Sequence, residues 1–276
     1  MRLGGPLFET YTDPASWIAA LKRRNYSAAY CPQIPSEFSP ADFSLAAQNA
    51  NIVIAEVGAW RNNPLSRDET VRREAIRQIQ DQLALADEIG AQCCVNVAGS
   101  RGDRWDGPDA DDLTDATFDL IVETVREIID GVKPKRTFYT LEPMPWMYPD
   151  SIESYARLLE AIERPAFAVH FDPVNLINTP HRYFRNGEYM QEFVSALGSH
   201  IKCVHVKDIV LRTQLTTHLD EVRPGSGALH YPALLTALNT LGLDLPLMLE
   251  HMTDPQDYVL GAAFIRETAA QVSIPL

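Results

Sequence analysis

The chain has 276 residues, and 46% of them are hydrophobic, which is enough to bury one large core or two small ones. The formal net charge of −13 excludes the basic face that a nucleic-acid-binding protein needs, and it makes anionic membranes poor partners. No apolar run reaches the ~18 residues that a membrane-spanning helix requires, and the first residues lack the apolar core of a signal peptide.

Short apolar segments alternate with longer amphipathic segments along the whole chain. The short ones are rich in β-branched and aromatic residues and are bounded by Gly, Pro or polar residues, which is typical of strands. We expect strands at residues 2–7, 26–31, 51–58, 92–99, 137–143, 166–172, 201–208 and 245–251. The longer ones have apolar residues at helical spacing, and several begin with a cap such as Asp13 before Pro14. We expect helices at residues 13–24, 39–50, 66–90, 112–131, 150–163, 186–198, 230–242 and 254–272.

Eight strand–helix units in strict alternation predict an α/β protein with a single (β/α)8 TIM-barrel domain over residues 1–276. A doubly wound open sheet is the alternative, but the turn after the first strand, "RLGGPLFE", lacks the spaced glycine fingerprint of that fold. The four cysteines lie in strand-like segments without zinc-finger spacing. This favours buried, reduced thiols and a cytoplasmic protein.

Ionisable side chains lie at or near the ends of four expected strands: Glu142, Asp172, His205 and Glu250. In a TIM barrel these strand ends form the active site. Three carboxylates at close range would raise one another's pKa, and a divalent cation bound by all four groups removes that conflict. We expect one divalent metal ion, Mn²⁺ in the first place, with Mg²⁺, Co²⁺ or Fe²⁺ as alternatives. The competing interpretation is a set of ordinary rim charges that are hydrogen-bonded to loops.

Two further ionisable residues lie near this group. Glu56 ends the third expected strand and is a candidate substrate contact, unless it pairs with Arg61 or Arg101. His170 lies two residues before Asp172 and therefore points to the same side, into the barrel. It either orients a metal ligand or is a satisfied core histidine.

Lys207 and the segment "EPMPWMYP" supply other candidate substrate contacts. Lys207 has the same strand parity as His205, so it either reaches the substrate or neutralises the surplus of carboxylates. Trp146 closely follows the proposed ligand Glu142, and together with Tyr148 it suits stacking on a sugar ring.

Four motifs in this order, "LEP", "FDPVN", "VHVKD" and "LMLEH", resemble the xylose-isomerase-like sugar isomerase/epimerase superfamily, most closely its ketose 3-epimerase branch. The resemblance covers essentially the whole chain. It implies that Glu142 and Glu250 bind the metal and also act as acid/base groups, while Asp172 and His205 complete the ligand set. It also implies that Arg223, in "VRPGSG", lies against substrate oxygens.

Two positions depart from the family pattern. Asn175 stands where these epimerases often have a histidine, and Tyr148 stands where they often have a glutamate. Both positions concern substrate recognition, so they leave the sugar open. The abasic-site endonucleases of the same superfamily use many more histidines, and the net charge of −13 also argues against that class.

The expected function is therefore a metal-dependent sugar epimerase or isomerase, most specifically a ketose 3-epimerase. It would remove a proton next to a carbonyl through an enediolate. If one glutamate moves the proton between neighbouring carbons, the outcome is aldose–ketose isomerisation. If the enediolate expels a β-substituent, the outcome is a lyase or hydratase on 3-keto sugars or glycosides, which could need a partner subunit. A non-catalytic sugar-binding barrel is the remaining alternative, and a homo-oligomer is compatible with each.

Overall fold

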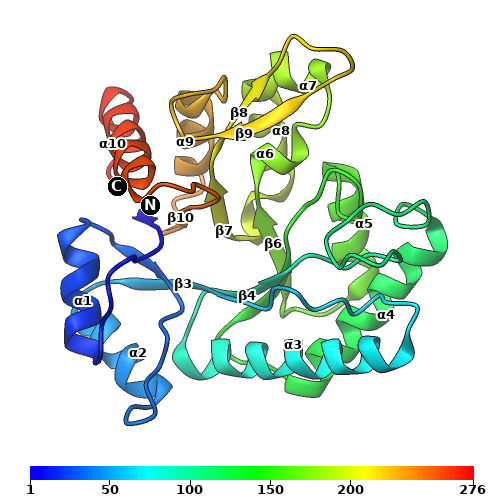
Figure 1. Cartoon of the computed structure of the whole chain (residues 1–276), viewed down its shortest axis with the longest axis horizontal. Coiled ribbons are helices and arrows are strands. Elements are labelled where there is room, and N and C mark those ends of the chain that lie inside the picture. The colour runs from blue at the N-terminus through cyan, green and yellow to red at the C-terminus, as the bar shows by residue number, and fades with distance from the viewer.

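The computed structural model describes all residues from Met1 to Leu276. Eight parallel strands close into a barrel, with helices on its outside (Figure 1). Neighbouring strands follow the order of the sequence, which confirms the predicted single-domain TIM barrel. The barrel strands are β1 (Arg2–Gly4), β2 (Ala28–Tyr30), β3 (Val53–Gly58), β4 (Cys93–Asn96), β5 (Phe138–Leu141), β6 (Phe167–Phe171), β7 (Ile201–Val206) and β10 (Pro246–Leu249).

One long helix follows each barrel strand, and a side-chain cap marks the start of every one except α8. The Asp13 side chain accepts the backbone N–H of Ser16 before α1, and the Ser39 side chain accepts that of Asp42 before α2. Gly90 ends α3 in the left-handed conformation. The long helices are α1 (Pro14–Arg23), α2 (Pro40–Asn49), α3 (Glu69–Ile89), α4 (Asp115–Val132), α5 (Ile152–Ile162), α8 (Asn186–Leu197), α9 (Tyr231–Asn239) and α10 (Pro255–Gln271).

Two insertions at the C-terminal end of the barrel were not predicted. The first consists of the short helices α6 (Pro173–Leu176) and α7 (Pro180–Phe184) after β6. The 3-10 turn η1 (Gly198–His200) lies at the other end of the barrel, directly before β7. The expected strand over residues 201–208 ends at Val206, and β8 (Asp208–Leu211) then pairs antiparallel with β9 (Leu219–Val222). This β8–β9 hairpin extends beyond the barrel strands (Figure 1).

The Asp208 side chain, two residues after the end of β7, fixes the base of the hairpin through hydrogen bonds to the backbone. Its Oδ1 accepts the backbone N–H groups of Ile209 and Leu229, both at 2.8 Å. Its Oδ2 accepts those of Gly225 at 2.9 Å and Gly227 at 3.1 Å. A Cβ at Gly227 would lie 2.3 Å from Asp208 Oδ1, so only glycine allows this approach. One carboxylate thus joins both ends of the hairpin insertion.

The barrel interior near the N-terminal ends of the strands is uncharged. It is filled by five fully buried side chains that form a cluster apart from the main core, and we call them the neutral layer: Ala28, Ala55, Cys93, Cys203 and Met248. None of the four cysteines forms a disulfide. No helix combines the length and apolar character that crossing a bilayer would require.

Candidate active site

Along a single strand, the side chains inside the barrel change from neutral to charged in a step of two residues. On β7 the inward side chains are Cys203 and then His205, and on the last strand Met248 is followed by Glu250. This step brings ionisable groups from five chain segments to the C-terminal end of the barrel. We call them the charged layer, and all are buried: Glu56, Glu142, His170, Asp172, His205, Lys207 and Glu250.

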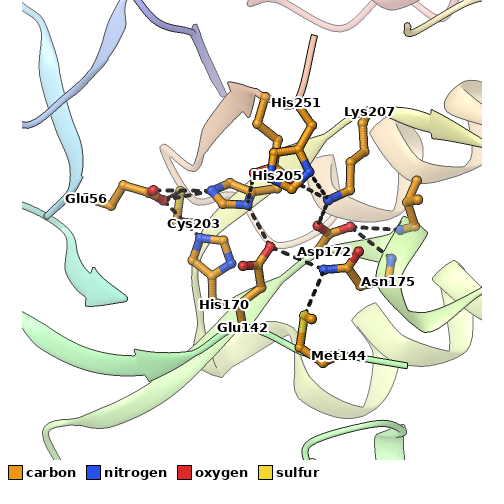
Figure 2. A network of polar contacts seen from close by, with 12 residues as sticks. Glu56, Glu142, Met144, His170, Asp172, Asn175, Cys203, His205, Lys207 and His251 are labelled. Atoms are coloured by element: carbon orange, nitrogen blue, oxygen red, sulfur yellow. Dashed lines mark hydrogen bonds and ion pairs between the residues drawn. The ribbon is translucent and has the colours of Figure 1, made fainter. Parts of the chain in front are cut away.

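The four predicted metal ligands meet in this layer, as Figure 2 shows for three of them. One ligand atom from each of Glu142, Asp172, His205 and Glu250 lies within 4.8 Å of the others. His205 Nδ1 is 2.9 Å from Glu142 Oε1 and 2.9 Å from Glu250 Oε2. These distances and the set of oxygen and nitrogen donors fit a divalent cation of the Mn²⁺ or Mg²⁺ kind.

Asp172 supports this fit because its two oxygens have different surroundings. Oδ1 accepts the backbone N–H groups of Val174 at 2.9 Å and Asn175 at 3.1 Å. Oδ2 is buried and accepts no hydrogen bond of good geometry, although Lys207 Nζ lies 2.7 Å away. The backbone therefore fixes one oxygen and leaves the other directed at the cluster.

The charges of the cluster are strongly interdependent. Burial raises the pKa of Asp172 well above its usual value, and Glu250 and Glu142 add to that shift against the effect of Lys207. For His205, burial favours the neutral ring, but Glu250, Glu56 and Glu142 outweigh it and hold its pKa well above the usual value. Without a bound cation, the raised pKa values of Asp172 and His205 favour their protonated forms. A divalent cation bound here would displace these protons.

Lys207 is a buried ammonium group enclosed by carboxylates. It lies 2.5 Å from Glu250 Oε1, 2.7 Å from Asp172 Oδ2 and 3.1 Å from Glu221 Oε1. Burial opposes its charge, but these carboxylates, led by Asp172, raise its pKa well above the usual value. Lys207 is not among the residues that line the cavity above the cluster. Of the two predicted roles, the structure supports neutralisation of carboxylates.

Glu56 lies beneath His205 and does not pair with Arg61 or Arg101. Its Oε2 is 2.9 Å from His170 Nε2, and both of its oxygens are 3.2 Å from His205 Nε2. Burial would raise the pKa of Glu56, but the two imidazoles outweigh burial and hold it below the usual range. The predicted substrate contact is therefore a partner of the histidines. Because Glu56 faces Nε2, the nitrogen of His205 left for a metal is Nδ1.

His170 takes part in this arrangement through Glu56, with no hydrogen bond to Asp172. Its ring stands edge-on to that of His205, with the ring centroids 4.2 Å apart. Its Nδ1 is buried and has no hydrogen-bond partner. The role of orienting a metal ligand stays a prediction, and through Glu56 the residue that His170 would orient is His205.

A cavity of about 820 Å³ opens above the charged layer, and its floor contains Glu56, Glu142, His205 and Glu250. Three of the predicted substrate contacts line it: Glu56 in the floor, and Trp146 and Asn175. Asn175 Nδ2 also donates to Glu142 Oε1 at 3.4 Å (Figure 2).

The structure does not bring two other predicted contacts to the cavity. Tyr148 donates its hydroxyl to the Leu113 carbonyl oxygen at 3.2 Å, and its ring packs edge-on against Phe118. Arg223 lies beyond the β8–β9 hairpin, where its Nε pairs with Asp257 Oδ1 at 3.1 Å. Neither residue lines the cavity above the cluster.

Several cavity residues were missed by sequence reasoning because they lie on unpredicted elements. Ile177 follows α6, and Leu219 and Glu221 belong to β9. The only sequence signal for the hairpin is the alternation in "DIVL" and "LDEV", which is too short to separate from loop sequence. Arg61 also lines the cavity, and it was considered only as a partner of Glu56.

Comparisons with known proteins agree with this fold. A family model described as xylose isomerase-like TIM barrel matches residues 6–268. A structure titled L-ribulose 3-epimerase superposes with a TM-score of 0.73 at 12% identity, covering 99% of this chain and 95% of that one. A D-tagatose 3-epimerase-like protein gives 0.72 at 19% identity, with coverages of 99% and 98%. The 3-keto-D-glucoside 4-epimerase of E. coli gives 0.68 at 14% identity, with coverages of 97% and 99%. None of the proteins with curated descriptions matches the chain in sequence.

Proposed function

The chain belongs to the xylose isomerase-like TIM barrel family, and from this premise we propose that it is a divalent-metal-dependent sugar epimerase or isomerase. The observation that carries the proposal is the placement of Glu142 and Glu250 on either side of His205 Nδ1, each at 2.9 Å. Their strands, β5 and β10, are separated by β6 and β7 in the barrel. Two carboxylates can therefore approach a substrate on the cavity floor from different sides.

The residues of the floor can perform the proton transfers of such a reaction. A bound divalent cation would supply positive charge that stabilises an enediolate forming on two neighbouring substrate oxygens. Glu142 Oε2 has no hydrogen-bond partner, so it is free to accept the proton from the carbon next to the carbonyl. Glu250, whose Oε1 is held by Lys207, would return a proton on the other face and invert that carbon.

Within this class, epimerisation of a ketose at carbon 3 is the first choice, because two of the structural neighbours bear 3-epimerase titles. We propose Glu142, Asp172, His205 and Glu250 as ligands of one metal ion, with Mn²⁺ first and Mg²⁺, Co²⁺ or Fe²⁺ as alternatives. A sugar is the proposed partner molecule, and the four unpaired cysteines support a cytoplasmic location.

A second candidate is the conversion of 3-keto glycosides, by epimerisation or by β-elimination. Two observations favour it. One structural neighbour is a 3-keto-D-glucoside 4-epimerase, and the cavity of about 820 Å³ has room beyond a single sugar ring. The first proton abstraction is the same in both candidates, so Glu142 and Glu250 keep their roles.

Proton NMR of keto sugars in D₂O tests the proposal. The metal-loaded protein should exchange the proton next to the carbonyl for deuterium, and a protein stripped with EDTA should not. The products then distinguish epimerisation, isomerisation and elimination. A lack of exchange across free ketoses and 3-keto glycosides, with one metal ion bound per chain, would contradict the proposed function.

A further inference from the structure

The cavity is much larger than its charged part. Its volume of about 820 Å³ lies towards the upper end of the roughly 300–1,000 Å³ that hold drug-sized ligands. Four of the ionisable residues that line it form its floor, Glu56, Glu142, His205 and Glu250, and four others line it elsewhere, Arg61, Asp106, Glu221 and His251. A single sugar ring placed over the floor leaves most of the space above unfilled, and that space has mainly apolar walls.

One wall is a series of indole rings that leads from the floor to the rim. The ring of Trp60 is 6.4 Å from that of His205, and the ring of Trp105 is 6.5 Å from that of Trp60. Trp146 continues the series, because its Nε1 donates to the carbonyl oxygen of Asp106 at 3.0 Å. All three tryptophans line the cavity.

The loop after β3 holds Trp60 in this place at a conformational cost. The indole lies directly on Gly58, where a Cβ would be 2.2 Å from Trp60 Nε1. The next residue, Arg61, has a φ of 69°, a left-handed conformation that a residue with a side chain rarely adopts. Asn62 secures the turn by donating to the Ala59 carbonyl oxygen at 2.9 Å. Gly58, Arg61 and Asn62 thus together fix the position of the Trp60 indole.

The opposite wall combines aliphatic side chains with Thr217 and Glu221. In the closed order of the barrel, β7 lies four strands from β3, so the hairpin that follows β7 faces the Trp60 loop across the mouth. The cavity residues on this side include Ile209 and Leu219 of the hairpin and Ile177 after α6. An indole wall facing these aliphatic side chains forms a slot that suits a flat apolar ring.

We propose that the substrate is a keto-glycoside with an aromatic aglycone, an inference that rests on the second candidate of the proposed function. The sugar ring lies on the charged floor, and the aglycone lies between the Trp60 and Trp105 indoles and the side chains of Ile209 and Leu219. In a glycoside the anomeric carbon is an acetal, so the carbonyl must be on another ring carbon. The substrate must therefore come from a reaction that oxidises a ring hydroxyl of an aryl glycoside.

Calorimetric binding of two unreactive glycosides to the metal-loaded full chain tests the slot. The probes are phenyl β-D-glucopyranoside and methyl β-D-glucopyranoside, which share the sugar and differ in the aglycone. We expect the phenyl glycoside to bind at least ten-fold more tightly. Trp105→Ala and Leu219→Ala should each weaken phenyl glycoside binding and abolish most of that preference. Phe184→Ala, which removes a 75% exposed ring on α7 outside the cavity, should preserve it.

The two glycosides binding equally, or a preference that survives both cavity variants, would overturn the inference. If Trp105→Ala fails to fold, Leu219→Ala on the opposite wall decides the matter. The outcome is separate from that of the proposed function, which is read by deuterium exchange into keto sugars. Exchange without a phenyl preference rejects only the aromatic aglycone, and a slot-dependent phenyl preference without exchange rejects only the proposed reaction.

Discussion

The neutral layer and the charged layer occupy the same barrel and share strands, but they contribute differently to the protein. Cys93, Cys203 and Met248 fill the neutral layer with uncharged side chains, whose burial stabilises the fold without further partners. Two residues further on, His205 and Glu250 belong to a layer in which each buried charge depends on a neighbour. The C-terminal end of the barrel is therefore organised for chemistry and is costly to fold, since unpaired buried charges are strongly destabilising.

The two layers touch at one point, where the Cys203 thiol donates to Glu56 Oε2 at 3.2 Å (Figure 2). Substitutions on the charged side of this contact should change catalysis, metal binding or stability strongly. Substitutions on the neutral side should not. The expected effects below run from the largest to the smallest.

Removing either proposed acid/base group should have the largest effect. Glu142→Gln and Glu250→Gln keep the shape of the side chain and remove its basicity, so each should slow deuterium exchange roughly 10²–10⁴-fold. The rate is measured by proton NMR at saturating metal, with metal content checked in each variant. Glu188→Gln, on an exposed part of α8, is the control. Near-normal exchange in either variant would rule out that residue as an acid/base group.

Lys207→Met should lower the free energy of unfolding of the metal-free protein by about 3–5 kcal/mol, because Asp172 and Glu250 lose their buried counter-charge. Saturating metal should recover part of this loss. Urea denaturation with and without metal measures both values. Lys202→Met, at a partly exposed lysine of β7, is the comparison. Equal stability of the two variants without metal would contradict the neutralising role.

Glu56→Gln should weaken metal binding by roughly 10–100-fold, the usual effect of losing a group that orients a metal-bound histidine. The fold should persist, because glutamine still fills the site under His205 and His170. Calorimetric titration with Mn²⁺ measures the affinity. Glu221→Gln, which removes a charge beside Lys207 without touching a proposed ligand, is the matched control. If the two variants bind Mn²⁺ equally well, Glu56 does not position His205.

Cys203→Ala should have the smallest effect. It lies in the neutral layer, and loss of its sulfur should cost roughly 1 kcal/mol of stability, as an average core substitution does. Metal affinity should stay within two- to three-fold of the original, since Glu56 keeps both histidine contacts. Thermal unfolding and Mn²⁺ titration measure the two quantities. A large loss of metal binding would show that the layers are not independent.

The parts of this arrangement that follow from strand parity could be predicted from the sequence. Glu142, Asp172 and Glu250 each follow a recognisable barrel strand, so the fold alone brings them to one end. The placement of Glu56 under His205 depends on how distant strands face each other across the barrel. A single sequence does not indicate which side chains of non-neighbouring strands meet across the barrel.

Loop positions were predicted less well than strand positions. Arg223 was assigned to the substrate through the family pattern, and Tyr148 as an aromatic side chain suited to stacking on a sugar. The structure ties them to Asp257 and Leu113. Arg223 follows the β8–β9 hairpin, and the length of such an insertion decides where the chain returns to the barrel. Trp146 lines the cavity, since only a short segment separates it from a strand end, and its contact with a substrate stays a prediction.

The central claim is that the charged layer is a divalent metal centre. Crystals of the Mn²⁺-loaded protein, measured by anomalous diffraction at the manganese edge, test it most directly. The account predicts one strong peak within about 2.0–2.6 Å of His205 Nδ1, Asp172 Oδ2, Glu142 and Glu250. The absence of a peak there, or a peak among Glu56, His170 and Cys203 instead, would contradict it.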